Sequence, residues 1–304
     1  MSHNHEHHHP APTSFSRAFA IGIALNTVFV AVEAYYGWQI NSLALLADAG
    51  HNLSDVAGLL LAWGAALAAR LQPDARHTYG WRRASILAAF ANAVLLLVAM
   101  GSLAWEALGR LNSPEATQGW TLITVATIGI VINSVTALLF LRGREHDLNV
   151  RGAFLHMAAD ALVSLGVVIG GVLYLWQGWA WLDPVISLGI AAVIVAGSWG
   201  LLRQSLHLLF DGVPEGINLP AVHTWLAARP GVARVDDLHV WAMSTTQVAL
   251  TAHLVMPAGH PGDDFLHEAS EALHEHFGID HATLQITRAP LMAACHVFHE
   301  ERGS

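Results

Sequence analysis

Two stretches of the chain repeat one pair of metal-binding side chains at the same spacing. The first holds His51 and Asp55 and the second holds His156 and Asp160, each pair four residues apart. Residues four apart share one face of an α-helix, so each pair presents an imidazole beside a carboxylate. If the two faces meet, two nitrogens and two oxygens surround one point, a tetrahedral donor set that suits Zn²⁺. The lack of a thiolate argues against copper(I).

The alternative for each pair is a structural His–Asp hydrogen bond. One such pair in an apolar helix is commonly structural, whereas two copies of one spacing on separate segments favour a shared metal site. Asp48 lies one turn before His51 and is predicted either to orient the imidazole or to pack between helices. Glu33, Asn92 and Asn133 are interpreted first as interhelical hydrogen-bond partners and second as pathway residues.

The segments that carry these pairs are long and apolar. The chain has 304 residues, of which 54% are hydrophobic and 12% charged, and its mean hydropathy is +0.45. An average soluble domain has about a quarter charged residues, so much of this surface must face lipid. A membrane-spanning helix needs roughly 20 apolar residues. The sequence predicts a mainly α membrane protein with six spans, at 16–38, 43–69, 84–110, 118–142, 151–177 and 181–205.

Burial in lipid constrains where the ionisable side chains point. Each ionisable group near the bilayer centre costs about 2.5–3.5 kcal/mol, so the His and Asp pairs must face the interior of the bundle. A dication bound to two carboxylates would neutralise them. The domain prediction is accordingly a six-helix transmembrane bundle over residues 16–210.

The arginines predict the orientation of this bundle. One side of the six-helix arrangement carries Arg17, Arg70, Arg76, Arg82, Arg83, Arg142, Arg144, Arg151 and Arg203. The other side has only Arg110 near a helix end, so the first side is predicted to be cytosolic. Both termini then lie in the cytosol, in agreement with the missing secretory signal. Residues 1–15 are predicted to be a disordered, His-rich tail that either holds metal loosely or is inert.

The composition changes after the last apolar segment. Residues 211–290 are predicted to form a small cytosolic α+β domain, and residues 291–304 a tail. The predicted order is helix, strand, strand, helix, strand, at 219–228, 232–243, 247–256, 263–277 and 282–289. This order favours helices packed on one face of a small sheet. The net charge of −9 argues against nucleic acid as a partner, and the single Cys295 excludes an intrachain disulfide.

Taken together, these segments resemble the cation diffusion facilitator family, in its bacterial zinc-exporting branch. The resemblance rests on SLALLADAGH followed by Asp55, the loop HTYGWRR, LNVRGAFLHMAAD, and the motifs DDLHVWAMS and HATLQI. It implies six transmembrane helices, a ferredoxin-like or metallochaperone-like cytosolic domain, a homodimer in the bacterial inner membrane, and metal–proton antiport by alternating access. It also implies that His51, Asp55, His156 and Asp160 are the intramembrane ligands, with His51 favouring zinc over manganese.

The resemblance implies a further metal site in the loop between the second and third spans. Asp74 and His77 match the ligand pattern that some family members have there. Trp81 stands where a further His can be found, which argues against a complete loop site.

A regulatory zinc site in the cytosolic domain is the other implication. His253 matches a family ligand, Asp236 stands where a His can occur, and His239 lies nearby. Gln285 and Thr287 replace a His and a carboxylate. We therefore expect this site to be weakened or altered.

Two other functional classes are considered. A membrane metalloprotease would need a His-Glu-x-x-His helix and a di-iron bundle Glu-x-x-His repeats, and the apolar segments contain neither. A metal sensor that binds zinc without moving it would lack flux in vesicles. We expect a transporter instead, in which His51 and His156 carry protons, because a ligand imidazole must lose its proton to bind metal.

Overall fold

The computed structural model describes residues 13–113, 117–140 and 148–289. The chain divides into two compact units. The first comprises Met1–Leu60 with Asn92–Trp199, and the second comprises Leu61–Ala91 with Gly200–Ser304.

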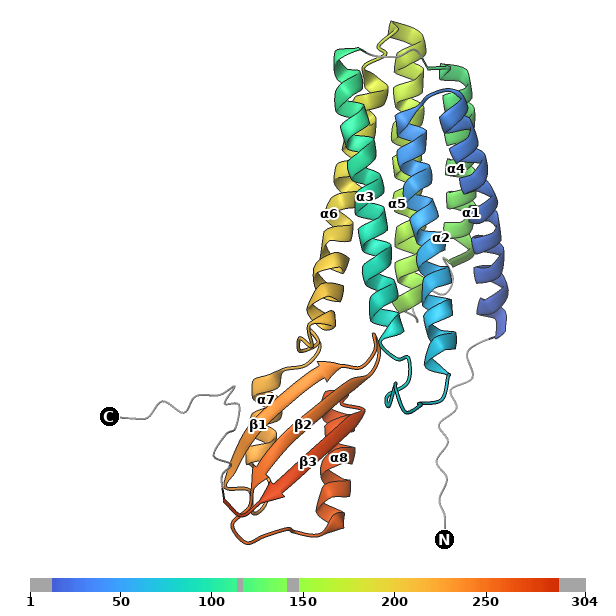
Figure 1. The fold of residues 1–304 in the computed structure, drawn as a ribbon. Helices are drawn as coiled ribbons and strands as arrows, with labels where there is room; N and C mark the ends of the chain where they lie inside the picture. The colour runs from blue at the N-terminus through green and yellow to red at the C-terminus, as the bar shows by residue number, and fades with distance from the viewer. Residues whose placement is uncertain (1–12, 114–116, 141–147, 290–304) are drawn as a thin grey trace. The chain divides into compact units, whose positions relative to one another are not determined.

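Six long helices make up the apolar part of the chain (Figure 1). They are α1 (Thr13–Gln39), α2 (Leu43–Ala69), α3 (Ala84–Asn112), α4 (Gly119–Phe140), α5 (Leu148–Gln177) and α6 (Leu182–Leu209). Their bounds agree with the six predicted segments to within a few residues, since Gly, Asn and Pro interrupt the apolar runs at their ends. The last two residues of the fourth predicted segment lie outside the described residues.

Four of the helices have the length and composition of membrane spans within the described residues. Within the described residues, four stretches are long and apolar enough to cross a bilayer: Ala84–Asn112, Gly119–Leu138, Phe154–Gln177 and Leu182–Leu209. Both α1 and α2 include side chains that the structure does not describe. Large apolar side chains such as Val98, Leu162 and Val193 are more than 60% exposed, which suits a surface that contacts lipid. The fold class is a mainly helical membrane bundle with a small α+β domain.

A glycine allows α1, α4 and α5 to approach closely. A Cβ atom at Gly129 of α4 would lie 2.7 Å from Cζ of Phe29 on α1 and 3.2 Å from Oγ of Ser164 on α5. The Phe29 ring is 2% exposed and therefore has no free space into which it could move. Small residues at such crossings are the usual means by which membrane helices pack tightly. Gly129 thus fixes the distance between three helices of the bundle.

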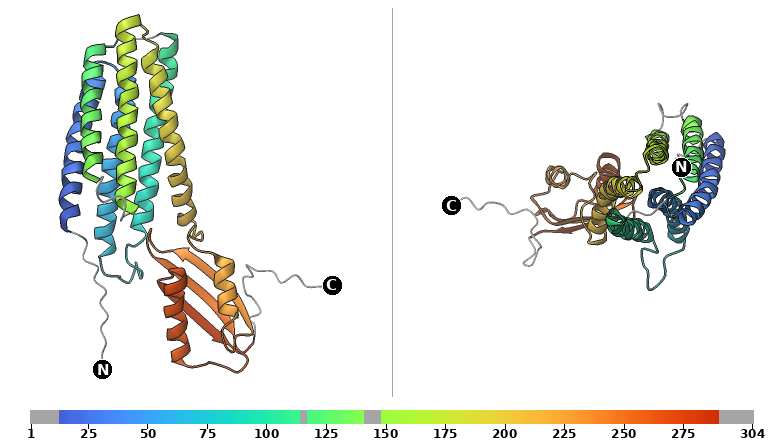
Figure 2. Two further views of the ribbon diagram at one scale, coloured as in Figure 1. Left: turned by 180° about the vertical axis from the view of Figure 1, so that it is seen from behind. Right: turned by 90° about the horizontal axis from the view of Figure 1, so that it is seen from above.

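The C-terminal part forms a three-stranded sheet with two helices. Its elements are α7 (Leu219–Ala227), β1 (Arg234–Ala242), β2 (Val248–Val255), α8 (Asp263–Phe277) and β3 (His281–Thr287). The strand order is β1-β2-β3, with β1 antiparallel and β3 parallel to β2. Both helices lie on one face of the sheet (Figure 2). The predicted order of elements and the single helical layer are confirmed.

Burial in this domain follows the alternation of the strands. Leu250 and Leu254 of β2 pack with Leu273 of α8, and all three are fully buried. Alternate residues of β3 point to the other face of the sheet, where His281, Thr283 and Gln285 are exposed. Gly278 ends α8 in the left-handed conformation, at φ 66°, which glycine adopts without strain.

Replacing Gly129 with Ala should destabilise the bundle. We expect a loss of about 1 kcal/mol or more, because the added methyl group overpacks a contact with the trapped Phe29 ring. Thermal unfolding of the detergent-solubilised protein measures the effect. Gly189→Ala is the matched control, since nothing lies within 4 Å of a Cβ atom there. Equal melting temperatures for the two variants would contradict this role of Gly129.

Candidate metal centre

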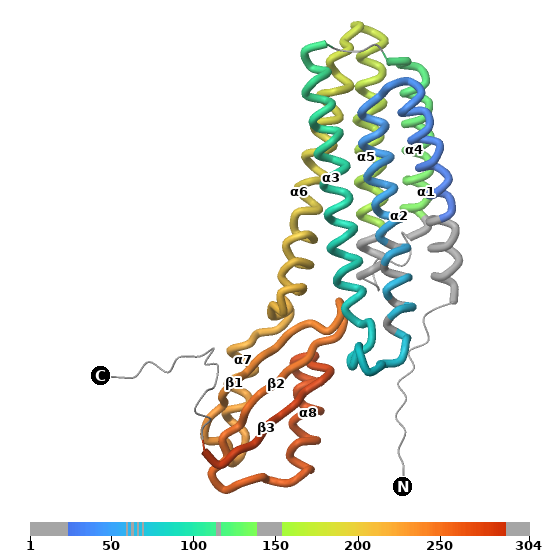
Figure 3. Tube along the Cα trace, in the orientation of Figure 1, coloured from blue at the N-terminus to red at the C-terminus, as the bar shows by residue number. Residues whose placement is uncertain are grey.

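The helices α2 and α5 lie side by side and bring four potential metal ligands together (Figure 3). Each of His51, Asp55, His156 and Asp160 offers one ligand atom, and these four atoms all lie within 4.8 Å of one another. The i, i+4 spacing places each pair on one helix face, and the two faces meet. Among the described residues, this is the one group of three or more His, Cys, Asp or Glu that could hold a metal ion.

The distances between ligand atoms suit a single tetrahedral ion. Nε2 of His156 lies 3.0 Å from Oδ2 of Asp55 and 3.6 Å from Oδ2 of Asp160. Nε2 of His51 lies 3.8 Å from Oδ2 of Asp55 and 3.5 Å from Oδ1 of Asp160. Metal–ligand bonds of about 2.0–2.2 Å in a tetrahedron require ligand atoms roughly 3.3–3.6 Å apart. The four residues can therefore bind one ion with small side-chain movements.

Exposure differs between the members of the centre. The side chain of Asp160 is 3% exposed, whereas those of Asp55 and His156 are 30% and 39% exposed. Two carboxylates in an apolar bundle need a positive charge nearby, because burying an unpaired charge is costly. A bound dication would supply that charge.

Asp48 lies next to this centre but has another hydrogen-bond partner. Its Oδ2 atom accepts a hydrogen bond from Oγ of Ser164 on α5 at 3.0 Å. The buried Nδ1 atom of His51 has no hydrogen-bond partner among the described residues. Of the two roles predicted for Asp48, this arrangement favours the bridging of α2 and α5.

The other polar residues of the bundle differ in whether their side chains form hydrogen bonds between helices. Ser54 on α2 donates to Oδ1 of Asn92 on α3 at 3.3 Å. Asn52 on α2 donates to Oε2 of Glu33 on α1 at 3.4 Å. These two are interhelical hydrogen bonds, as predicted. Asn133 is fully buried, and within the described part of the chain neither its side-chain nitrogen nor its oxygen has a partner.

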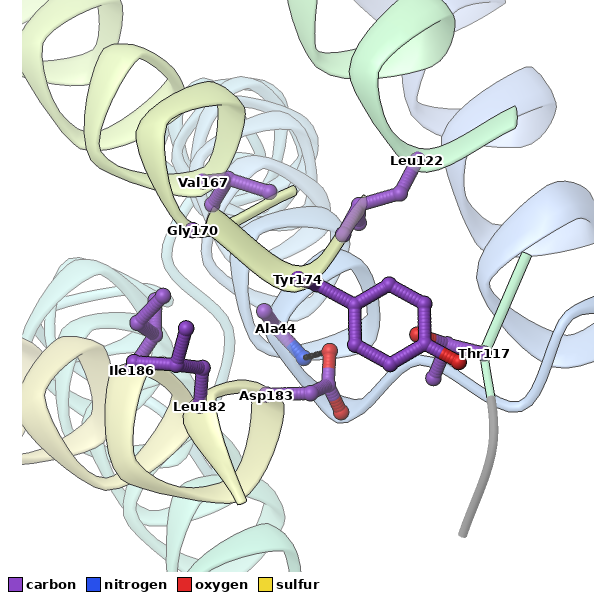
Figure 4. A pocket seen from close by; sticks show the side chains of 9 residues that line it. All are labelled: Ala44, Thr117, Leu122, Val167, Gly170, Tyr174, Leu182, Asp183 and Ile186. Carbon is purple, nitrogen blue, oxygen red and sulfur yellow. Dashed lines mark hydrogen bonds between the residues drawn. The ribbon is translucent and has the colours of Figure 1, made fainter. Parts of the chain in front are cut away.

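Asp183, which the sequence analysis did not single out, anchors α2. Its Oδ2 atom accepts from the backbone N–H of Leu43 at 2.8 Å. Its Oδ1 atom accepts from the backbone N–H of Ala44 at 3.4 Å (Figure 4). The hydroxyl of Ser42 also donates to Asp183. The first N–H groups of a helix have no partner within it, and a carboxylate there also interacts favourably with the helix dipole. An acidic residue at the start of an apolar segment is the only sequence signal for this role.

Arg110 at the end of α3 secures the same turn. Its guanidinium donates to the backbone oxygen of Asn41 at 2.7 Å and to the side-chain oxygen of that residue at 2.8 Å. Asn41 has φ 58°, a left-handed conformation that asparagine tolerates better than most residues. Together, Asp183 and Arg110 fix the start of α2 two turns before His51.

A small cavity adjoins Asp183 (Figure 4). Its volume of about 10 Å³ has room for roughly one water molecule. It is lined by Ala44, Thr117, Leu122, Val167, Gly170, Tyr174, Leu182, Asp183 and Ile186. None of the four clustered ligands lines it, so this cavity is separate from the candidate metal centre.

The predicted loop ligands lie together, but as a pair. Nδ1 of His77 lies 3.3 Å from Oδ1 of Asp74. Backbone N–H groups of His77 and Arg76 donate to the Asp74 carboxylate and lower its pKa, so the loop keeps this negative charge to lower pH. The ring of Trp81 stacks on that of His77 at 4.3 Å, where a third ligand could otherwise stand.

The predicted residues of the sheet have separate partners. Asp236 accepts from Arg234 at 2.6 Å, and Nε2 of His239 lies 3.1 Å from Oδ1 of Asp237. Nε2 of His253 lies 2.6 Å from Oγ1 of Thr287. Asp236 and His253 are opposite one another in the β1–β2 register, but their side chains join no metal-binding group within the described residues.

The fold and the site define a membrane protein whose interior can bind a cation. The profile of the cation efflux transmembrane domain matches residues 19–210, and that of the cation efflux protein cytoplasmic domain matches residues 214–289. The chain belongs to the cation efflux family, also called the cation diffusion facilitators, in the branch that contains bacterial zinc exporters. It is a transporter, which confirms the resemblance of its motifs.

Curated relatives are similar over nearly the whole chain. The metal cation efflux system protein CzcD of Cupriavidus metallidurans is 36% identical over 95% of this chain and 92% of the relative. The zinc transporter ZitB of Escherichia coli is 35% identical over 97% of this chain and 94% of the relative. A protein of Bacillus subtilis named cadmium, cobalt and zinc/H(+)-K(+) antiporter is 31% identical over 94% and 92%.

Removing the Asp183 carboxylate should destabilise the bundle. We expect Asp183→Ala to cost about 1–2 kcal/mol, because it leaves two backbone N–H groups and the Ser42 hydroxyl without an acceptor. Asp183→Asn retains one acceptor oxygen and should lose less. Thermal unfolding in detergent ranks the two variants, and identical melting temperatures for both and for wild type would refute the anchoring role.

Proposed function

We propose that this chain exports a divalent metal cation, with zinc as the main substrate, from the bacterial cytosol across the inner membrane. Residues 16–210 form the transmembrane domain of six helices, and residues 211–290 form the cytosolic domain. Both termini lie in the cytosol. The observation that carries the proposal is the group of two imidazoles and two carboxylates between α2 and α5, with ligand atoms within 4.8 Å of one another.

Zinc is the cation that this donor set suits best. Two nitrogens and two carboxylate oxygens in a tetrahedron form a common zinc coordination sphere, and the site contains no thiolate to favour copper(I). The name of the Escherichia coli relative specifies zinc, and that of the Bacillus subtilis relative specifies zinc together with cadmium and cobalt. Since ligand type governs affinity, we expect Cd²⁺ and Co²⁺ to compete with zinc.

The counter-ion in this proposal is the proton. Zinc and protons compete for the same imidazole nitrogens, so binding metal releases protons and protonation releases metal. His51 and His156 are proposed to carry the protons, because an imidazole changes its charge closer to neutral pH than any other unperturbed side chain. The name of the Bacillus subtilis relative includes protons, which supports the same mechanism.

The proposed mechanism is alternating access, and the unequal exposure of the ligands supports it. Asp55 and His156 are partly exposed, and Asp160 is buried against α2. Movement of α5 against α2 would close the exposed side and open the other, while the ligands stay on the same two helices. Helix rearrangement around a fixed midplane site is the general mechanism of secondary transporters.

The first test is zinc flux into proteoliposomes under an imposed pH gradient. Asp160→Ala should lower zinc affinity by more than about tenfold, because even residues that only support a ligand are worth about 10–100-fold. Flux should fall accordingly. Glu106→Gln, at an exposed carboxylate of α3, is the control and should transport like wild type. Equal flux for Asp160→Ala and wild type would rule out the four-residue transport site.

The cytosolic domain is proposed to be dimeric and to bind a regulatory zinc ion weakly. Support comes from the sheet face that neither helix covers (Figure 2). In the β1–β2 register Asp236 lies opposite His253, and His239 follows on β1. Each of these side chains would have to leave its present partner to bind metal, so occupancy requires high zinc. The loop pair Asp74 and His77 is proposed as a still weaker site.

His253→Ala separates these roles. We expect lower flux or weaker dimer closure, with zinc still bound at the intramembrane ligands, because the two sites share no residue. Zinc stoichiometry and flux of the full-length protein measure this, with the exposed His276→Ala on α8 as a control. Loss of all zinc binding in His253→Ala would contradict the proposal that the intramembrane transport site and the cytosolic regulatory site are separate.

A further inference from the structure

A second polar cluster lies inside the bundle, apart from the four metal ligands. It consists of Glu33 on α1 and Asp48 on α2, with one supporting residue for each carboxyl group, Asn52 and Ser164. Glu33 is fully buried and Asp48 is 1% exposed. Neither residue belongs to the group that could hold the metal, and the proposed exchange of metal for protons has so far not used them.

In each carboxyl group of this cluster, one oxygen accepts a hydrogen bond from a described residue and the other does not. Oε2 of Glu33 accepts from Asn52 at 3.4 Å, and Oδ2 of Asp48 accepts from Ser164 at 3.0 Å. The remaining oxygens, Oε1 of Glu33 and Oδ1 of Asp48, are buried and receive no hydrogen bond from any donor among the described residues. Asn52 lies one turn after Asp48 on α2, so its hydrogen bond to Glu33 brings the Glu33 carboxyl group to the face of α2 that carries Asp48.

Two ionised carboxylates cannot share such a site. Both would be acceptors only, and a hydrogen bond between them requires one of them to carry a proton. Like charges in contact within an apolar interior repel strongly, and the usual solution is one proton shared by two carboxyl groups. Two titratable metal ligands lie one helical turn away: His51 follows Asp48 on α2, and Asp160 precedes Ser164, the partner of Asp48, on α5. Since Asp160 adds further negative charge, it too favours retention of a proton.

We propose that Glu33 and Asp48 form a proton-binding site of the transporter, distinct from the metal ligands, in which the two carboxyl groups share one proton. The proton lies between the two oxygens that lack another donor and leaves the pair with a single negative charge. This inference rests on the proposed function and deepens it, because it gives the counter-transported proton a place of its own.

The cluster is built on the same helix turns as the metal centre. Asn52, which supports Glu33, follows His51 directly on α2. Ser164, which supports Asp48, lies one turn after Asp160 on α5. A movement of α5 against α2 that changes the metal centre therefore also changes the hydrogen bond from Ser164 to Asp48. Proton affinity of the pair and metal occupancy are coupled through these two helices.

Infrared spectroscopy of the full-length, metal-free protein tests the proton directly. Wild type should show the carbonyl stretch of a protonated carboxylic acid, shifted in D₂O. Glu33→Gln and Asp48→Asn should each lose this band, because the amide N–H of the new side chain takes the place of the shared proton. Glu106→Gln, at an exposed carboxylate paired with Arg110, should keep it. A wild-type spectrum without the band, or variants that retain it, overturns the proposal even if a variant folds poorly.

Transport measurements test the role of the site. Proteoliposomes containing a zinc-sensitive and a pH-sensitive dye give the number of protons moved per zinc ion. We expect Glu33→Gln and Asp48→Asn still to bind zinc, since all four metal ligands are intact, and to move fewer protons per zinc. An unchanged proton-to-zinc ratio in both variants overturns the transport role. Wild-type protein that moves zinc without protons would instead refute the proposed exchange, while the infrared result still decides whether the pair binds a proton.

Discussion

A carboxylate inside an apolar helix bundle has no water to stabilise its charge, and this constraint governs how α1, α2 and α5 are arranged. Asp160 and Asp48 are almost completely buried, and Glu33 is fully buried. Each must be neutralised by a cation or a proton. The free-energy cost of burying an unpaired charge at such depth would otherwise exceed the free energy of unfolding of an ordinary fold. The bundle is therefore assembled around carboxyl groups that are stabilised by a positively charged partner, and this favours the binding of a cation or a proton inside it.

The rest of the bundle holds these groups at fixed distances. Asp183 and Arg110 secure the start of α2 through hydrogen bonds to its first turn and to Asn41. Gly129 lets α1 and α5 approach α4 closely. These contacts lie away from the metal ligands. The ligand atoms are only 3.0–3.8 Å apart, so a small shift of either helix would change the geometry of the site. Rigidity at the helix ends thus supports the geometry at the centre.

The buried carboxylates form two sets with different partners. Asp160 lies beside two imidazole nitrogens and can share a metal ion with them, because nitrogen and oxygen donors together suit zinc. Among the described residues, the side chains that donate hydrogen bonds to Glu33 and Asp48 are an amide and a hydroxyl, which leaves a proton as the simplest positively charged partner of this pair. A carrier with both sets can hold each ion of an exchange at a different place on the same helices.

The sequence by itself determined the helices and the ligand pairs, because apolar length and i, i+4 spacing are local properties. His51 with Asp55 and His156 with Asp160 could be paired on their helices before any coordinates were known. Only the tertiary structure decided that α2 meets α5 at these turns, and that Asp183, distant in the sequence, caps α2. It also showed that Asp48 accepts a hydrogen bond from Ser164 and not from the imidazole of His51. Such contacts depend on how helices far apart in the chain pack together, which residue spacing within one helix does not encode.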